Sequence, residues 1–168
     1  MIKTGIGKWG LMMMFLIIGF FVFSSSMASE SQWIKTYGGS NDDWVFSIQQ
    51  TSDGGYIVAG YTGSFGAGYW DTWVLKLDGS GNMQWQTIYG GSSHDHANSI
   101  QQTSDGGYIV AGQTASFGFA GLYDAWVLKL DGSGNMQWQT IYGGRGTDCA
   151  NSIKQTSDGG YVCNSRLH

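Results

Sequence analysis

Positive charge is scarce in this sequence. After residue 28 there are six lysines and arginines against twelve acidic residues, which gives a net charge of −6. The few lysines and arginines are spread along the chain and form no basic cluster. Because nucleic-acid binding depends on such a cluster to meet the phosphate backbone, the composition argues against nucleic acid as a partner.

Proline does not occur, and Glu30 is the only glutamate among the twelve acidic residues after residue 28. The other eleven are aspartates, whose short side chains bond to nearby backbone amides and favour turns, whereas glutamate favours helices. The sequence after residue 28 therefore predicts an all-β fold without helices. Without a helix, its glycine pairs cannot form a phosphate-binding loop at a helix start, which argues against nucleotide binding.

Only one long hydrophobic run occurs, at residues 11–23. Its 13 residues fall short of the roughly 20 that a helix needs to span a bilayer. The run follows Lys3 and Lys8 and precedes small residues that end at Ala28, which is the pattern of a cleavable secretory signal peptide. We expect residues 1–28 to be a helical signal peptide and the remainder to be exported to the periplasm, the cell surface or the medium, free of the membrane after cleavage. An uncleaved anchor is the alternative.

The sequence has only two cysteines, Cys149 and Cys163. Export would permit a disulfide, but both residues lie in expected strands of a hairpin that turns at Asp158-Gly159. That register puts Cys163 opposite about residue 154, which is roughly 16 Å from Cys149 along the strand. A disulfide needs Cα atoms within about 7 Å of each other, so we expect no intrachain bridge.

The dominant feature of the sequence is a repeat. Trp33, Trp85 and Trp138 begin three copies: residues 33–84, 85–137 and the partial copy 138–168. The stretches TSDGGYIVAG and WVLKLDGSGNMQWQTIYGG recur unchanged in the first two copies. A one-residue insertion falls between SFGAGYWD of the first copy and SFGFAGLYD of the second, which marks this stretch as a surface loop.

Each full copy predicts four antiparallel strands, which in the first copy are residues 44–51, 54–62, 72–77 and 83–89. Asp53-Gly54 between the first two is a strong hairpin signal, because both central residues of such a turn need positive φ. The second and third strands are apolar at nearly every position, so we expect them to be covered on both faces, with the mixed first and fourth strands at the edges. Four strands in about 52 residues, repeated, are typical of β-propeller blades.

At these residues the chain resembles known repeats. The segment Lys76-Leu77-Asp78-x-x-Gly81-x-x-x-Trp85, which recurs at 129–138, looks like the tryptophan-docking motif of quinoprotein propellers. The whole unit more closely resembles the tandem repeats of large exported bacterial and archaeal proteins, which are generally of undefined function and are thought to form propellers. The resemblance implies a propeller fold. A quinoprotein-like dehydrogenase is the alternative function that it implies, by analogy of fold alone.

Two and a half blades are too few for a closed ring, which takes about four to eight. We expect residues 33–37 to be a lone fourth strand ahead of the first full blade, which brings the count to eleven strands. Apolar blade faces should stay uncovered and favour self-association. Either chains assemble to close a ring, or the reading frame is a truncated piece of a longer gene, or even a remnant without function. The abrupt loss of the repeat at Cys163 favours truncation.

The chain contains no set of nucleophile, base and orienting residue, so we expect no enzyme, no catalytic residue and no cofactor.

His94 and His96 could form a metal pair on one face of a strand, but the other copies lack both histidines, and we expect a loop pair without metal. Asp43, Asp95 and Asp148 recur at one place, where they should bond to amides of their own turn or cap the strand that follows. Calcium is the alternative there, because exported Asp-rich loops can offer it oxygen ligands.

Aromatic residues in the variable loop are the candidate contact site. Loops carry the binding residues of many scaffolds, and exposed aromatic rings suit sugars or protein partners, whereas packing against the blade beneath is the alternative. The expected function is therefore that of an exported binding or structural module of unknown ligand. The candidate residues are Phe65, Tyr69, Trp70, Phe117, Phe119 and Tyr123.

Overall fold

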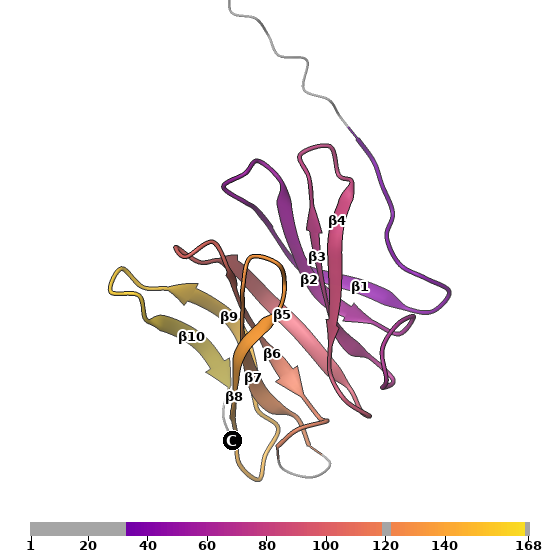
Figure 1. Ribbon diagram of the computed structural model, residues 1–168. Helices are drawn as coiled ribbons and strands as arrows, with labels where there is room; N and C mark the ends of the chain where they lie inside the picture. Colours follow the sequence, from indigo (N-terminus) through magenta and orange to yellow (C-terminus); the bar gives the residue numbers. More distant parts are fainter. Residues whose placement is uncertain (1–32, 119–121, 167–168) are drawn as a thin grey trace, which may run out of the picture. The chain divides into compact units, whose positions relative to one another are not determined.

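The computed structural model describes residues 33–118 and 122–166, and every regular element in them is a β-strand (Figure 1). Two four-stranded antiparallel sheets, ordered β1-β2-β3-β4 and β5-β6-β7-β8, precede a two-stranded sheet of β9 and β10. The predicted all-β fold of repeated, blade-like sheets is confirmed. The strands are β1 (Asp43–Gln50), β2 (Tyr56–Thr62), β3 (Asp71–Leu77), β4 (Met83–Tyr89), β5 (Asp95–Gln102), β6 (Tyr108–Thr114), β7 (Asp124–Leu130), β8 (Met136–Tyr142), β9 (Cys149–Gln155) and β10 (Tyr161–Arg166).

The expected signal helix at residues 1–28 lies outside the described residues. Within the part of the chain that the structure does describe, no helix is long and apolar enough to cross a membrane.

The predicted hairpin joins the first two strands of every sheet. In the first sheet the Thr51 amide donates to the Gly55 carbonyl at 2.9 Å, and the Asp53 carboxylate accepts hydrogen bonds from the Gly55 amide and the Thr51 hydroxyl. Among the residues of this turn only Gly54 has a positive φ, of +80°, so the expectation that both central residues of the turn have one is wrong. The turn spans Thr51–Gly55 instead of two residues. The Asp53 side chain stabilises it through hydrogen bonds, while the Asp53 backbone keeps a negative φ.

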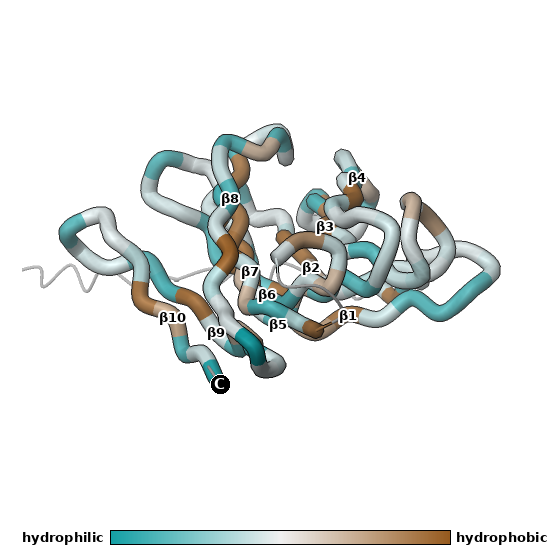
Figure 2. The backbone as a smooth tube through the Cα atoms, turned by 90° about the horizontal axis from the view of Figure 1, so that it is seen from below, coloured by the Kyte–Doolittle hydropathy of each residue, from teal (hydrophilic) through white to brown (hydrophobic). Residues whose placement is uncertain are grey.

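The two middle strands of each full sheet are covered on both faces, as predicted. In the first sheet, Val58 and Trp73 pack on one face with Trp33. Ile57 and Val74 pack on the other face, in the apolar core shared with the second sheet. In Figure 2 the apolar stretches accordingly lie within the strands, and the connecting loops are mostly polar. The hydrophobic cores therefore lie between successive sheets, so that each sheet needs its neighbour to bury its apolar faces.

Successive sheets meet through the same contacts. We call the interface of the first two sheets the first junction, and that of the second and third sheets the second junction. At the first junction the Ile100 amide donates to Ser47 Oγ at 3.2 Å, and the Gln102 amide donates to Gln49 Oε1 at 2.8 Å. The second junction has the corresponding bonds, from Ile153 to Ser99 at 3.3 Å and from Gln155 to Gln101 at 2.8 Å. One residue set, shifted by one copy, thus fixes how each sheet sits on the next.

Residues 33–37 are not a strand, contrary to expectation. The structure describes no third strand of a preceding sheet beside this segment, so its backbone has no ladder to join. Its side chains still occupy the place of a fourth strand: Trp33 Nε1 donates to the Gly79 carbonyl at 3.2 Å, and the Tyr37 hydroxyl donates to the Gly81 carbonyl at 2.5 Å. One copy later, the hydroxyl of Tyr89 in β4 makes the matching bond to the Gly134 carbonyl.

The first strand of the first sheet, β1, leaves apolar side chains in solvent. Val45 is 50% exposed and Ile48 is 60% exposed, whereas their counterparts Ala97 and Ile100, one copy later, are 1% and 4% exposed. Since Ile48 and Ile100 lie in the same SIQQ sequence, the difference comes from the presence of a neighbouring sheet in one case and not in the other. The expectation of uncovered apolar faces is therefore met on β1.

The two cysteines occupy the expected hairpin. Cys163 pairs with Ile153, one residue from the predicted position, and Cys149 pairs with Arg166. Both thiols are free. Burial raises the pKa of each, which keeps them protonated at neutral pH.

Candidate functional site

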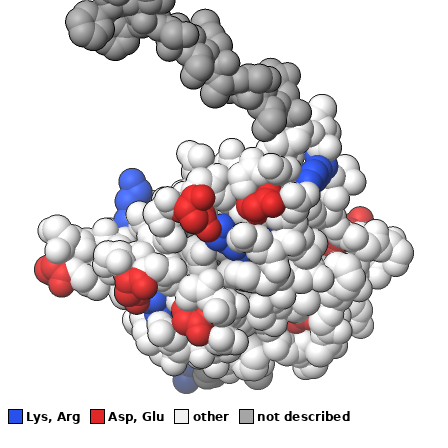
Figure 3. Space-filling view, turned by 45° about the horizontal axis from the view of Figure 1, so that its top comes forward, with Lys and Arg blue, Asp and Glu red and all other residues white. Residues whose placement is uncertain are grey.

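The candidate residues lie at one end of the sheets, which we call the YGG end. It is formed by the Tyr-Gly-Gly loops that lead into β1, β5 and β9 and by the variable loops between the second and third strands of each full sheet. The Asp-Gly hairpins are at the opposite end. On the face shown in Figure 3, the charged side chains are scattered and form no basic patch.

Three of the six predicted residues come together at the first junction. The Tyr69 side chain is 75% exposed and stacks on His94, with 5.3 Å between the ring centroids. The Trp70 ring lies 4.7 Å from the His94 ring, and the Tyr123 ring of the second sheet lies 5.9 Å from the His96 ring.

The other three predicted residues are not in this group. Phe65 packs on Trp73 at 6.1 Å between ring centroids, and Phe117 packs on Trp126 at 5.5 Å. These two rings therefore serve the packing of their own sheets, which was the alternative interpretation of the loop aromatics. Phe119 lies outside the described residues.

Both histidines of the His-x-His pair belong to the group. His94 forms an isolated bridge with Trp70, and the neighbouring Asp95 amide donates to the Trp70 carbonyl at 2.7 Å. His96 stacks on Tyr61 of β2 at 4.8 Å. We call the six side chains the aromatic cluster: Tyr61, Tyr69, Trp70, His94, His96 and Tyr123.

Burial shifts the pKa of three side chains in the aromatic cluster. Burial lowers the pKa of His96, and repulsion from His94 lowers it further, so the His96 imidazole is uncharged at pH 7. Burial raises the pKa of Tyr61 and of Tyr123, which keeps both phenols protonated. His94 Nδ1 and His96 Nε2 are buried and accept or donate no hydrogen bond. Within residues 33–118 and 122–166, no three His, Cys, Asp or Glu side chains are arranged to hold a metal ion.

The recurring aspartates bond to amides of their own turns, as predicted. Asp43, Asp95 and Asp148 each accept a hydrogen bond from a glycine amide of the YGG loop, at 2.7, 2.9 and 2.8 Å respectively. Burial opposes ionisation of Asp43, but hydrogen bonds from Thr62, Gly39 and Ser64 outweigh this effect and lower its pKa. These side chains therefore hold the loops that carry the aromatic cluster.

Asp71 and Asp124, which open the third strand of their sheets, were not among the predicted site residues. Both are buried. A Cβ added to Gly90 would collide with Asp71 Oδ1 and would lie 2.7 Å from Asp95 Oδ2, so these two carboxylates meet beside the Gly90 backbone. The presence of an aspartate at this position in both full copies is a signal that the sequence did contain.

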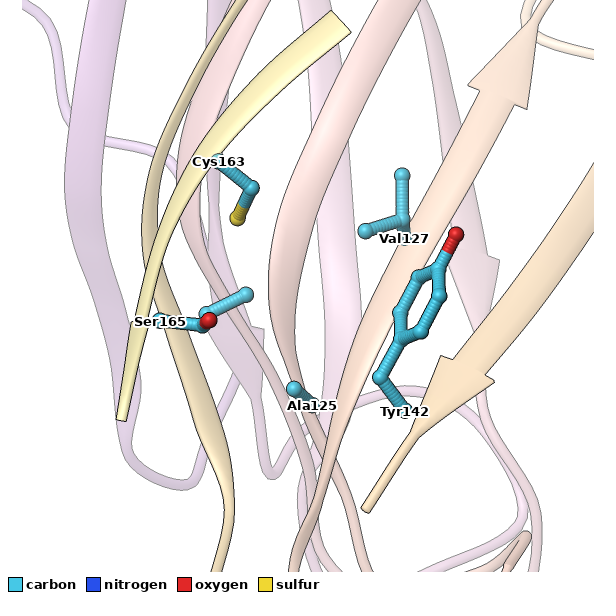
Figure 4. Close-up of a pocket in the computed structure, with 6 residues that line it drawn as sticks. Ala125, Val127, Tyr142, Cys163 and Ser165 are labelled. Carbon is cyan, nitrogen blue, oxygen red and sulfur yellow. The ribbon is translucent and has the colours of Figure 1, made fainter. Parts of the chain in front are cut away.

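A small apolar pocket of about 170 Å³ lies in the second junction. Val127 and Tyr142 line it from the second sheet, and Cys163 and Ser165 line it from β10 (Figure 4). Tyr142 is 54% exposed, whereas its counterpart Tyr89 is 6% exposed because the β7–β8 hairpin covers it. The described part of the third copy has no such hairpin, so the pocket is an uncovered part of the core between sheets.

Comparisons with known proteins do not assign this chain to a family: no family model matches it, and no curated protein matches it.

Proposed function

We propose that this chain is an exported, non-enzymatic propeller-repeat module that binds a ligand through the aromatic cluster at the YGG end. The observation that carries the proposal is Tyr69, a residue that is 75% exposed and whose ring stacks on His94. An exposed aromatic ring that is already held in place loses little conformational entropy on binding, which favours its use as a contact surface. Export is proposed on the pattern of residues 1–28 alone.

The chemistry of the cluster favours a carbohydrate. The exposed ring offers a flat, apolar face, and the aromatic cluster contains no carboxylate, lysine or arginine side chain that would select a charged ligand. A sugar ring with an apolar face suits such a surface. A protein partner is the competing ligand class, and the experiment below separates the two.

Glycan-array binding of the purified protein tests this proposal. We expect binding to a defined set of glycans that is lost, by at least about tenfold, in the double variant Tyr69→Ala, Trp70→Ala. Tyr142→Ala is the matched control, because Tyr142 is an exposed tyrosine outside the cluster. Absence of glycan binding by the wild-type protein would contradict the carbohydrate, and equal binding by the double variant would contradict the site.

A second proposal concerns self-association. The open face of β1 exposes Val45 and Ile48 at the positions where Ala97 and Ile100 meet a preceding sheet. A second copy of the chain offers part of the matching surface, because β9 and β10 of its third sheet correspond to the first two strands of the sheets that form the junctions. Sedimentation equilibrium should show mass rising with protein concentration, and Ile48→Lys should give a monomer. A wild-type monomer at all concentrations would refute this proposal.

A further inference from the structure

The first junction contains two buried carboxylates that face each other. Asp71 is 1% exposed and Asp95 is fully buried. They come from different sheets, at the first residues of β3 and β5, and Gly90 is the residue between them. Because Gly90 has no side chain, Asp71 Oδ1 and Asp95 Oδ2 both lie close to the position that a Cβ would occupy there.

The hydrogen bonds of the two aspartates leave one oxygen without a partner. Asp95 accepts from the hydroxyls of Thr114 and Ser116, at 2.5 Å each, and from the Gly91 amide. Asp71 Oδ2 accepts from the amides of the preceding loop, those of Ala67 at 2.8 Å and Gly68 at 3.0 Å. Asp71 Oδ1 is buried, lies on the same side of Gly90 as Asp95 Oδ2, and has no hydrogen-bond partner.

In residues 33–118 and 122–166, neither aspartate forms an ion pair with a lysine or arginine. In the described residues the two lysine–aspartate ion pairs, Lys76 with Asp53 and Lys129 with Asp105, are at the hairpin end, opposite to the YGG end. Two carboxylates that are both removed from water and lie beside the same glycine repel each other, and a cation bound between them would offset that repulsion.

We propose that the Asp71–Asp95 pair at the first junction binds a divalent cation, and that Ca²⁺ is the ion that it fits best. All the side-chain donors at this point are oxygens: the two carboxylates and the Ser116 hydroxyl that contacts Asp95. Calcium takes oxygen ligands in flexible geometries and completes its shell with backbone carbonyls and waters, whereas magnesium demands a near-ideal octahedron and softer metals prefer nitrogen or sulfur. This site is independent of the aromatic cluster's proposed ligand.

The repeat provides a second pair and a built-in comparison. At the second junction, a Cβ on Gly143 would collide with Asp124 Oδ1 and would lie 2.6 Å from Asp148 Oδ2, as at the first junction. At the first YGG loop, by contrast, a Cβ on Gly38 would meet Asp43 alone. Asp43 keeps the hydroxyl partners Thr62 and Ser64 and the amide of Gly39, so it differs from Asp95 in having no facing carboxylate.

Thermal unfolding at pH 7 tests the proposal. We expect about 5 mM CaCl₂ to raise the Tm of the wild-type protein by about 5 °C relative to EGTA at matched ionic strength, since an ion that binds only the folded state stabilises it. Asp71→Asn should reduce this shift, while in EGTA its Tm should equal or exceed that of the wild type because one buried charge is gone. Asp43→Asn is the matched control and should keep the full shift.

Two results would overturn the proposal. One is a wild-type Tm that calcium leaves unchanged. The other is a calcium shift of equal size in Asp71→Asn. Equilibrium dialysis with radioactive calcium on the wild-type protein decides the matter even if the variant does not fold, because no bound ion at millimolar calcium refutes the site.

Discussion

Two isoleucines that are identical in sequence context differ only in what covers them, and replacing each by alanine gives a direct measure of the packing between sheets. Ile100 is 4% exposed in the core of the first junction, and Ile48 is 60% exposed on the open face of β1. Both lie in an SIQQ segment in the first strand of their sheet. Any loss of intrinsic strand preference is therefore common to Ile100→Ala and Ile48→Ala and cancels when the two are compared.

The expected magnitudes follow from burial. An isoleucine-to-alanine change removes three carbons, worth about 2.4 kcal/mol of transfer free energy when the side chain is fully buried. The cavity that remains at a site between two packed sheets adds to this, so Ile100→Ala should lower the free energy of unfolding by about 3 kcal/mol. Ile48→Ala should lower it by less than about 1 kcal/mol, because most of the side chain is already in water.

Urea unfolding followed by tryptophan fluorescence measures both values. The experiment should be run at low protein concentration, so that self-association does not cover Ile48. Ile153→Ala, at the 4% exposed counterpart in the second junction, should resemble Ile100→Ala. If the Ile48 and Ile100 variants lose the same stability, the cores do not lie between sheets and the architecture described above is wrong.

Three further predictions concern single groups. Tyr89→Phe removes the hydroxyl that donates to the Gly134 carbonyl and should cost about 1–2 kcal/mol in urea unfolding, whereas Tyr142→Phe, at an exposed counterpart, should cost nothing measurable. His96 has a lowered pKa in the folded state, so protonation favours the unfolded chain; Tm should fall as the pH drops from 7 to 5, and His96→Gln should flatten this decline. Lys76 and then the Thr51 hydroxyl lower the pKa of Asp53, and the Thr103 hydroxyl and then Lys129 lower the pKa of Asp105, so the stabilisation from these contacts is present above about pH 4 and is lost as the pH falls further. Asp53→Asn with Asp105→Asn should weaken that acid-induced loss in circular dichroism melts, and an unchanged acid profile would show that these pairs contribute nothing.

The strands and hairpins could be predicted because their causes are local. The Asp-Gly pairs and the apolar runs that flank them determine where β1 and β2 begin and end, and the structure differs from the predicted bounds by only a residue or two. Residues 33–37 show the limit of that reasoning. Their pattern matches a fourth strand, but a strand also needs a partner to which its backbone can bond, and the described residues supply none.

The site depended on information that is not local. Tyr69 and Trp70 could be proposed as loop aromatics, but their contacts with His94 and His96 arise only when the second sheet packs on the first. Phe65 and Phe117 have the same sequence signal as Tyr69, yet they turn inward onto Trp73 and Trp126. The pairing of Asp71 with Asp95 likewise depends on the stacking of the sheets and on the bare backbone of Gly90.

The hydrogen bonds that serine and glutamine side chains of β1 and β5 accept from the next sheet bear on how arrays of this unit can grow. Each sheet offers an acceptor to the amides of the next, at Gln49 and again at Gln101, so a duplicated unit would arrive with its own attachment points and could be inserted without redesign of its neighbours. In the third copy the corresponding residue is Lys154, whose ammonium group can donate a hydrogen bond but cannot accept one. A unit grafted after this copy would lack that bond, and Lys154→Gln is the single change that would restore it.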